Sequence, residues 1–258
     1  MSPRYVRVKT DLGQINYGLL QLNRSVQVLD APPWLQGQPT DTEIAPETYE
    51  LLAPCSPSKI VAVGKNYARH AAEMGTPVPL EPLLFLKPPT AVIATQNLIY
   101  YPRQVRRLDY EGELALVIGD RIRSCTPEEA GSKIWGYTIA NDVTARDLQK
   151  LDGQWTRAKG FDSFCPIGPW IVRELSIGAT IQTFLNDNLV QSAQISEMVF
   201  APEKLVAYIS QVMTLLPGDI VLTGTPDGIG AMQVGDSVRV EIEGIGHLEN
   251  GVAASQIK

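Results

Sequence analysis

The sequence predicts an α+β protein that is mostly β, and three observations support this class. Short apolar runs separated by turns dominate the 258 residues, and 21 glycines and 19 prolines supply the turns. Few segments have the length and periodicity of helices, and neither regular strand–helix alternation nor an internal repeat is found. With 44% hydrophobic and 19% charged residues, the chain can bury a sizeable core.

The N-terminal part predicts a small β-rich domain. Residues 4–29 alternate between polar and apolar side chains, with Gly13 and Gly18 between the runs, as expected for short strands. Residues 31–57 are rich in proline, threonine and acidic residues, which is typical of a linker, and 46–52 is a candidate for a short helix. We therefore predict a small N-terminal domain and linker over residues 1–57 and a main domain over residues 58–258.

The main domain should begin with a buried strand over 59–63. A short helix should follow, with Asn66 as its N-cap, Gly75 as its stop and Pro77 beyond it. Further strands are predicted at 83–86, 114–118, 134–140, 167–172, 181–185, 220–222 and 237–242, and two further helices at 126–132 and 202–213. His247 is placed in a glycine-flanked turn.

Composition argues against several classes of protein. A net charge of −6 and a pI near 5.1 argue against nucleic acid as a partner, because phosphate binding needs a basic surface. The longest stretch without charged residues, 88–102, contains prolines and is too short to span a bilayer, so no membrane partner is expected. Three widely spaced cysteines predict no disulfide framework. We expect a cytoplasmic protein, since nothing at the start of the chain resembles an export signal.

Three carboxylates are candidates for metal ligands. On an extended chain Glu111 and Glu113 point to the same face, roughly 6–7 Å apart. Like charges beside a buried strand are costly unless a cation lies between them, and a hard ion such as Mg²⁺ suits oxygen ligands. Asp142 follows the strand 134–140 and could be the third ligand. The alternatives are a solvated strand end for the two glutamates and the cap of a helix over 143–148 for Asp142.

His70 and Glu73 are candidates for a general base and the carboxylate that orients it. Three residues apart, they share one face of a helix and can form a hydrogen bond. The predicted helix is too short to be stable by itself, so it could act as a lid that becomes ordered when a ligand closes it. The alternative is a surface pair without a catalytic role.

Two further segments carry candidate substrate-binding groups. Lys159 lies among Trp155, Ala, Gly and Phe residues, so its ammonium could be desolvated and favour an anionic substrate or an enolate. Alternatively, its stem packs on Trp155 while the ammonium reaches water. In the glycine-rich turn 223–230, the backbone amides and the hydroxyl of Thr225 could hold a carboxylate, although such turns are common.

Six segments, in this order along the chain, together resemble the fumarylacetoacetate hydrolase family. They are 63–74 (VGKNYARHAAEM), 84–88 (LFLKP), 109–114 (DYEGEL), 141–147 (NDVTARD), 159–162 (KGFD) and 223–226 (TGTP). The resemblance covers residues 59–252. It implies a catalytic domain built as a mixed β-roll, a small preceding N-terminal domain, and a homodimer.

The resemblance also implies a role for each candidate residue. The expected groups are Mg²⁺ or Mn²⁺ ligands (Glu111, Glu113, Asp142), catalytic residues (His70, Glu73, Lys159) and substrate-binding residues (Thr225, Gln149, Gly224, Phe85). Gly160 departs from the serine that many relatives have, without touching an expected ligand.

The expected activity is metal-dependent hydrolysis of an acylpyruvate, of the fumarylpyruvate or acetylpyruvate kind, to pyruvate and a carboxylic acid. The substrate would be a small 2-oxo acid. Two alternatives use the same enolate site: decarboxylation of oxaloacetate, and tautomerisation or isomerisation of a 2-oxo acid. A binding protein without turnover is a fourth possibility, but no expected site residue is missing. Arg69, beside His70, could select a second carboxylate or could equally face solvent.

Overall fold

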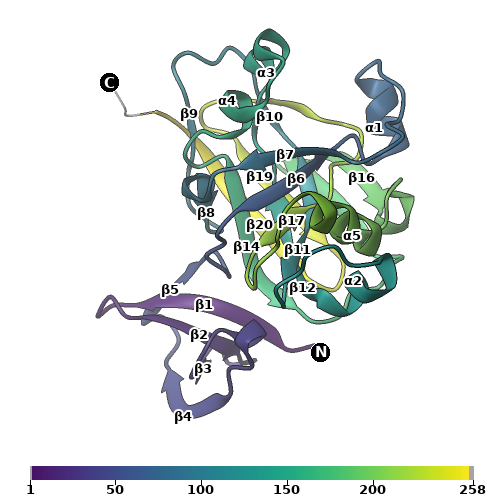
Figure 1. Ribbon diagram of the computed structural model, residues 1–258. Helices are drawn as coiled ribbons and strands as arrows, with labels where there is room; N and C mark the ends of the chain where they lie inside the picture. The colour runs from purple at the N-terminus through teal and green to yellow at the C-terminus, as the bar shows by residue number, and fades with distance from the viewer. Residues whose placement is uncertain (1, 256–258) are drawn as a thin grey trace.

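The computed structural model describes residues 2–255 and is mostly β, as predicted (Figure 1). The strands of the N-terminal part are β1 (Arg4–Thr10), β2 (Ile15–Leu20), β3 (Val26–Leu29), β4 (Pro39–Ile44) and β5 (Tyr49–Leu52). The strands of the remainder are β6 (Ile60–Gly64), β7 (Leu83–Lys87), β8 (Val92–Ile93), β9 (Ile99–Tyr101), β10 (Leu108–Tyr110), β11 (Gly112–Ile118), β12 (Ile134–Asn141), β13 (Thr144–Ala145), β14 (Cys165–Val172), β15 (Thr180–Leu185), β16 (Asn188–Gln194), β17 (Ile220–Leu222), β18 (Gly230–Met232), β19 (Ser237–Ile242) and β20 (Gly246–Ala254).

The helices are short and lie outside the sheets. They are α1 (Ala68–Glu73), α2 (Pro127–Lys133), α3 (Arg146–Asp152), α4 (Thr156–Lys159) and α5 (Pro202–Val212), with 3₁₀ turns η1 (Pro33–Leu35), η2 (Pro89–Ala91) and η3 (Ile195–Glu197). No helix in residues 2–255 is both long enough and apolar enough to cross a membrane.

The strands form three sheets with both parallel and antiparallel neighbours. The largest has the order β4-β3-β2-β1-β14-β12-β11-β17-β6-β7, with β5 on β1 and β8 on β14. The second has the order β16-β15-β19-β20-β9, and a small third sheet has the order β13-β10-β18. The β6–β17, β8–β14 and β9–β20 pairs are parallel, and the remaining pairs are antiparallel.

The main hydrophobic core lies between the largest sheet and the five-stranded sheet. Leu114, Leu116 and Ile139 from one side meet Ile181 and Val240 from the other. Helix α5 packs on the same cluster. Strand β11 is buried at every position, because a second apolar cluster covers its other face. This double burial fixes the strand that carries Glu113 and directly follows Glu111.

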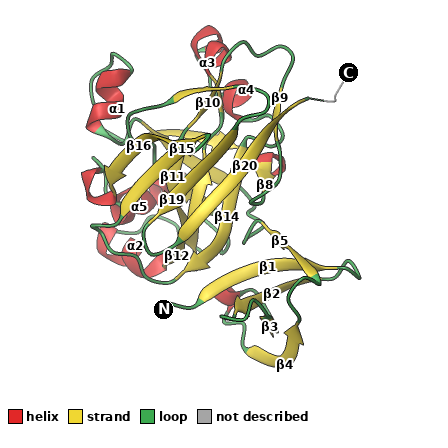
Figure 2. Ribbon diagram, turned by 180° about the vertical axis from the view of Figure 1, so that it is seen from behind, coloured by secondary structure: helices red, strands yellow, loops and turns green. Residues whose placement is uncertain are grey.

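The N-terminal strands lie at the opposite end of the molecule from α1, α3 and α4 (Figures 1 and 2). They join the largest sheet where Tyr5 of β1 pairs with Ile171 of β14. Trp34 of η1 packs edge-on against Trp135 of β12, so the two parts share apolar contacts.

Two predictions for the N-terminal part are wrong. Residues 31–57 are not simply a linker, because they contain η1, β4 and β5. The helix predicted at 46–52 does not form: residues 46–48 are in a turn, and Tyr49–Leu52 is strand β5, which pairs antiparallel with β1. Glu47 has a φ of 67°, which interrupts a right-handed helix, and Tyr49 and Leu51 pack against the apolar cluster of the small sheet. Sheet pairing and burial therefore outweigh local propensity.

Two local predictions in the main domain are also corrected, and one alternative is excluded. Asn66 does not cap α1, whose N-cap is Tyr67 without a side-chain hydrogen bond. Asp142 does not cap a helix over 143–148, because β13 lies there and α3 begins only at Arg146. His247 lies in β20, opposite Glu241, and not in a turn. Gly75, with a φ of 66°, does follow the end of α1 as predicted.

Candidate active site and metal centre

The three predicted metal ligands converge where β10, β11 and β12 meet. Glu111 lies between β10 and β11, Glu113 lies in β11, and Asp142 follows β12. The pairing of Gly112 with Asn141 aligns the strands, and the amide of Asp142 donates to the carbonyl of Glu111 over 2.8 Å. One oxygen from each of the three carboxylates lies within 4.8 Å of the other two, and all three side chains are buried. Among residues 2–255 no other cluster of this kind is found.

The ammonium of Lys159 lies against two of these carboxylates. Its Nζ is 2.7 Å from Oε2 of Glu111 and 2.5 Å from Oδ2 of Asp142. The side chain is buried and its Nζ lies 5.0 Å from the ring centroid of Phe85, so the ammonium does not reach water. Burial disfavours the charge, but the carboxylates of Asp142 and Glu111 outweigh it and raise the pKa of Lys159.

Sequence reasoning missed two further buried cations. Nζ of Lys87 lies 2.5 Å from Oδ1 of Asp142. Arg146 donates to Glu111, to Oδ2 of Asp109 over 2.8 Å and to Oε1 of Gln149 over 2.6 Å. Both cations lie in segments that carry the family resemblance, at the end of an apolar strand and the start of a helix, and this position was the available signal.

The surroundings shift the pKa values of the two glutamates in opposite directions. For Glu111, burial disfavours the anion, but Lys159 and Arg146 outweigh it and lower the pKa of the carboxyl group. For Glu113, burial acts together with the charges of Asp142 and Glu111 and raises the pKa well above its ordinary value of 4.5. Its Oε2 accepts a hydrogen bond of 2.7 Å from the amide of Gly224. A cluster of buried carboxylate oxygens with one destabilised anion fits a hard divalent cation.

His70 and Glu73 lie on α1 and are in contact. Nδ1 of His70 is 3.1 Å from Oε2 of Glu73, and the other carboxylate oxygen, Oε1, accepts from the amide of Gly228 over 3.1 Å. When Nδ1–H donates to this carboxylate, Nε2 of the neutral imidazole carries the lone pair of a base. The ring is buried and lines the pocket above the three carboxylates.

The glycine-rich turn after β17 closes another side of this pocket. Gly224 has a φ of 96°, and a Cβ there would lie 2.8 Å from Cβ of Asn66, so glycine is required. The side-chain amide of Asn66 is hydrogen-bonded through both of its polar atoms. Its Nδ2 donates to the carbonyls of Thr223 and Phe200, and its Oδ1 accepts from the backbone amide of Phe200. The hydroxyl of Thr225 accepts a 2.8 Å hydrogen bond from Gln191.

Eight of the ten predicted site residues line this one pocket, and the other two contact its lining. The eight are His70, Phe85, Glu111, Glu113, Asp142, Gln149, Lys159 and Thr225. Glu73 bonds to His70 and Gly224 bonds to Glu113.

Arg69 and Lys65, which lie on either side of Asn66 in the sequence, differ in their surroundings. Arg69 pairs with Glu197 at 3.3 Å, and 68% of its side-chain surface is exposed. Arg69 is not part of the pocket lining, so of the two alternatives for this residue the structure supports the one in which it faces solvent. Lys65 does line the pocket, has a φ of 59°, and has no ion-pair partner among the described residues. Sequence reasoning did not single out Lys65.

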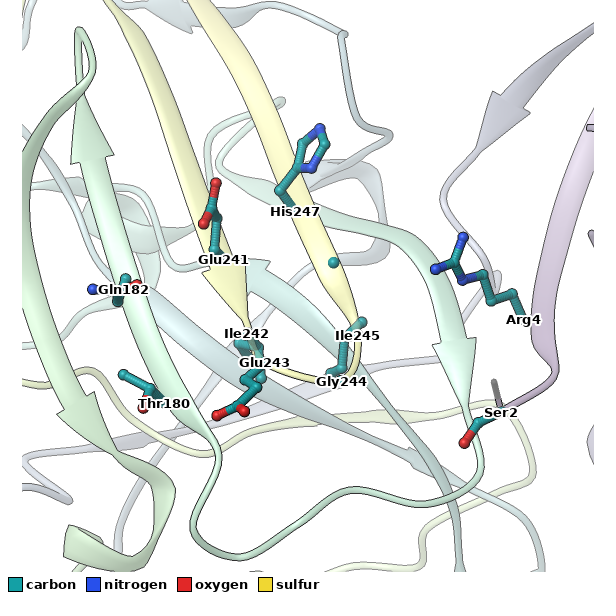
Figure 3. A pocket seen from close by; sticks show the side chains of 11 residues that line it. Ser2, Arg4, Thr180, Gln182, Glu241, Ile242, Glu243, Gly244, Ile245 and His247 are labelled. Carbon is teal, nitrogen blue, oxygen red and sulfur yellow. The ribbon is translucent and has the colours of Figure 1, made fainter. Parts of the chain in front are cut away.

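A second pocket lies between the N-terminal residues and the five-stranded sheet (Figure 3). The guanidinium of Arg4 lies 4.4 Å from the ring centroid of Trp170 beside it. Glu241 and His247, which are cross-strand partners on β19 and β20, face the same space. None of the predicted site residues lines this pocket.

The chain matches two known families along almost its whole length. Residues 59–253 match the family described as fumarylacetoacetate (FAA) hydrolase, C-terminal, and residues 4–54 match the Rv2993c-like N-terminal family. The chain is 41% identical over 216 residues to oxaloacetate tautomerase fahd2 of Xenopus laevis, which covers 78% of this chain and 68% of that protein.

Two solved structures extend the comparison. A 2-hydroxyhepta-2,4-diene-1,7-dioate isomerase from Mycobacterium marinum superposes with a TM-score of 0.91 at 39% identity, covering 99% of this chain and 100% of that one. A fumarylpyruvate hydrolase from Pseudomonas aeruginosa, in complex with Mn²⁺ and pyruvate, gives 0.74 at 32% identity, covering 80% and 92%. With these matches and this geometry, the chain belongs to the fumarylacetoacetate hydrolase family, whose members include hydrolases, isomerases and tautomerases.

Proposed function

We propose that this protein is a divalent-metal-dependent hydrolase that cleaves the C–C bond of an acylpyruvate to pyruvate and a carboxylic acid. The observation that carries the proposal is the position of His70, which is oriented by Glu73 and lines the same pocket as the three carboxylates. A base for water thus lies beside a site for an activating cation, which is the combination that hydrolysis requires.

Glu111, Glu113 and Asp142 would hold Mg²⁺ or Mn²⁺. Their all-oxygen donor set suits either ion. The related fumarylpyruvate hydrolase in complex with Mn²⁺ and pyruvate supports this assignment. When bound, the ion would supply Lewis acidity toward the 2-oxo acid and its enolate.

The side chains of the protein would perform the proton transfers. Nε2 of His70 would take a proton from water while Glu73 stabilises the imidazolium through Nδ1. The hydroxide formed would add to the acyl carbonyl, and the C–C bond would break to release the carboxylic acid and the enolate of pyruvate. Lys159 would offset the enolate charge until the proton taken up by His70 is transferred to the carbon atom of the enolate that was bonded to the acyl group, which gives pyruvate. Thr225 would donate a hydrogen bond to the substrate carboxylate.

Oxaloacetate tautomerisation is the second candidate, with decarboxylation or double-bond isomerisation as related reactions. It is favoured by the identity to a protein named as an oxaloacetate tautomerase and by the likeness to an isomerase structure. Tautomerisation needs only proton transfer between oxygen and carbon, so the same histidine could serve without a nucleophilic water.

A comparison of substrates tests the proposal. Metal-stripped protein is assayed with acetylpyruvate, fumarylpyruvate and oxaloacetate, before and after addition of Mg²⁺ or Mn²⁺. We expect metal-dependent release of pyruvate from an acylpyruvate. Metal-dependent loss of enol-oxaloacetate without any acylpyruvate turnover would replace the hydrolase by the tautomerase.

We also propose a small 2-oxo acid and a second copy of this chain as the partners, at work in the cytoplasm. Free thiols at Cys55, Cys125 and Cys165 suit a reducing compartment. Light scattering in solution should give twice the chain mass of 28.2 kDa. A mass of one chain would contradict the dimer and leave the enzymatic proposal untouched.

A further inference from the structure

Gln191, a residue of β16 in the five-stranded sheet, contacts two segments that border the candidate active site. Its side chain is buried, with 2% of the residue exposed. Oε1 accepts a 3.1 Å hydrogen bond from the amide of Gly112, the residue between the two glutamates. Nε2 donates to the hydroxyl of Thr225 over 2.8 Å and to the carbonyl of Pro226 over 2.9 Å. The side-chain amide of Gln191 therefore connects the segment that carries Glu111 and Glu113 to the glycine-rich turn.

The strands and loops around Gln191 are shaped for this reach. Thr183 pairs with Gln191 and Phe184 pairs with Leu189, so Val190 is an extra residue that forms a bulge. A bulge re-aims the neighbouring side chain. The segment opposite must also come close, and a Cβ on Gly112 would lie 3.3 Å from Oε1 of Gln191.

These hydrogen bonds determine the direction of the Thr225 hydroxyl. The amide of Gly112 can only donate and the carbonyl of Pro226 can only accept, so the Gln191 amide satisfies both in a single orientation. In that orientation Nε2 donates to Thr225, and the hydroxyl oxygen is the acceptor. Its own hydrogen makes no hydrogen bond among the described residues, and Thr225 lines the pocket. The hydroxyl is thereby available as a donor to a ligand.

We propose that Gln191 is a positioning residue that turns the hydroxyl of Thr225 into a hydrogen-bond donor for the carboxylate of a 2-oxo acid. This inference rests on the proposed function, because it assumes an anionic 2-oxo acid in the pocket. Gln191 itself does not line the pocket, so its effect on the ligand passes through Thr225.

A double-mutant cycle on ligand binding tests the inference. Binding of pyruvate to Mg²⁺-loaded protein is measured by calorimetry for wild type, Gln191→Met, Thr225→Val and the double variant. Each single change should weaken binding about tenfold, the usual effect of losing a hydrogen bond to a charged group. The double variant should bind no worse than Thr225→Val alone, because both changes remove one interaction. Thr225→Ser, which keeps the hydroxyl, should bind like wild type.

Controls separate positioning from general damage. Gln182 lies on the neighbouring strand β15 and lines the second pocket instead of the candidate active site, so Gln182→Met should leave the dissociation constant unchanged. Pyruvate binding is compared at saturating Mg²⁺ for every variant, because the Gln191 side chain also accepts a hydrogen bond from Gly112, between two of the proposed metal ligands. If Gln191→Met does not fold, Gln191→Glu keeps the size and should also weaken binding, since its oxygens would accept from Thr225 and redirect the hydroxyl.

Each remaining outcome is decisive. Wild-type affinity for pyruvate in Gln191→Met, or losses that add in the double variant, would overturn the positioning role while the proposed function stands. Wild-type protein that binds no pyruvate with Mg²⁺ and turns over no 2-oxo acid would overturn the proposed function and this inference with it.

Discussion

Glu73 uses its two carboxylate oxygens for different contacts, one to Nδ1 of His70 and one to the amide of Gly228. In Glu73→Gln the amide nitrogen can donate to Nδ1, which would place the imidazole proton on Nε2 and remove the base. We expect kcat for acylpyruvate hydrolysis to fall by about 10²-fold or more. Steady-state kinetics measure this, with Mn²⁺ affinity as the control that should not change. A variant that hydrolyses at the wild-type rate would contradict the base assignment.

Glu113 is an anion that the metal-free pocket stabilises poorly. Its pKa in the folded protein is raised above 4.5, so the protonated form contributes stability that is lost as the pH rises through the raised pKa. Glu113→Gln cannot ionise, so it does not lose this stability. Above pH 4.5 the Tm of the metal-free variant should therefore be higher than the Tm of the metal-free wild type. The variant should also gain no stability from Mg²⁺, which wild type should gain by mass action. Parallel Tm profiles would contradict the prediction.

Lys65 is a cation of the pocket lining without an ion-pair partner among the described residues. We expect it to contact the second carboxylate of a dicarboxylic substrate. Lys65→Met should raise KM for fumarylpyruvate or oxaloacetate about tenfold, and leave KM for acetylpyruvate, which has one carboxylate, within about twofold. The control is Arg69→Met, because Arg69 pairs with Glu197 outside the pocket. An equal rise for both substrate types would show that Lys65 does not read the second carboxylate.

At the scale of elements, α1 depends on its neighbours. Six residues are too few for an isolated helix, and Glu73 joins it to the glycine-rich turn at Gly228. A Cβ on Gly228 would lie 2.1 Å from the carbonyl oxygen of Val190, and its φ is 93°. Gly228→Ala should therefore displace the turn, speed hydrogen exchange of the α1 amides and lower kcat about tenfold or more.

A matched glycine separates the displacement from backbone strain. Gly235 has a φ of 99°, but a Cβ there would meet nothing within 4 Å. Gly235→Ala should lower Tm slightly and leave both exchange of α1 and kcat unchanged. If the two variants behave alike, the contact between Glu73 and the turn does not hold the helix.

At the scale of the whole molecule, the N-terminal strands and the larger remainder of the chain share one aromatic cluster. Trp34 packs edge-on against Tyr17 and Trp135 and is 8% exposed. Trp34→Ala should destabilise the protein by about 3–5 kcal/mol, measured by denaturant unfolding. The N-terminal strands lie at the opposite end of the molecule from α1, α3 and α4, so KM and kcat should be unchanged at temperatures where the variant is folded (Figure 1). A change in KM would show coupling between the two ends.

Local sequence was sufficient where burial and spacing act within a few residues. Strands β11 and β19 coincide closely with the predicted 114–118 and 237–242. A continuous apolar run in β11 and a strict alternation of apolar and polar residues in β19 are both local patterns that a sheet buries. The glutamate pair and the His–Glu pair were likewise found from spacings of two and three residues. The roles assigned to them stay predictions until the variants are measured.

Only the tertiary structure determined the contacts between residues that lie far apart in the chain. Lys87 lies 55 residues from Asp142, and Gln191 lies 79 residues from Gly112, so neither contact has a local signal. The strand over Tyr49–Leu52 was mistaken for a helix for the same reason, because its pairing with β1 is not encoded nearby. The sequence by itself determined the class, about half of the strands and the residue types of the site. The assembled sheets determined which cations neutralise the carboxylates and which amide orients Thr225, because charge and hydrogen-bond energies depend on distances that only the folded chain sets.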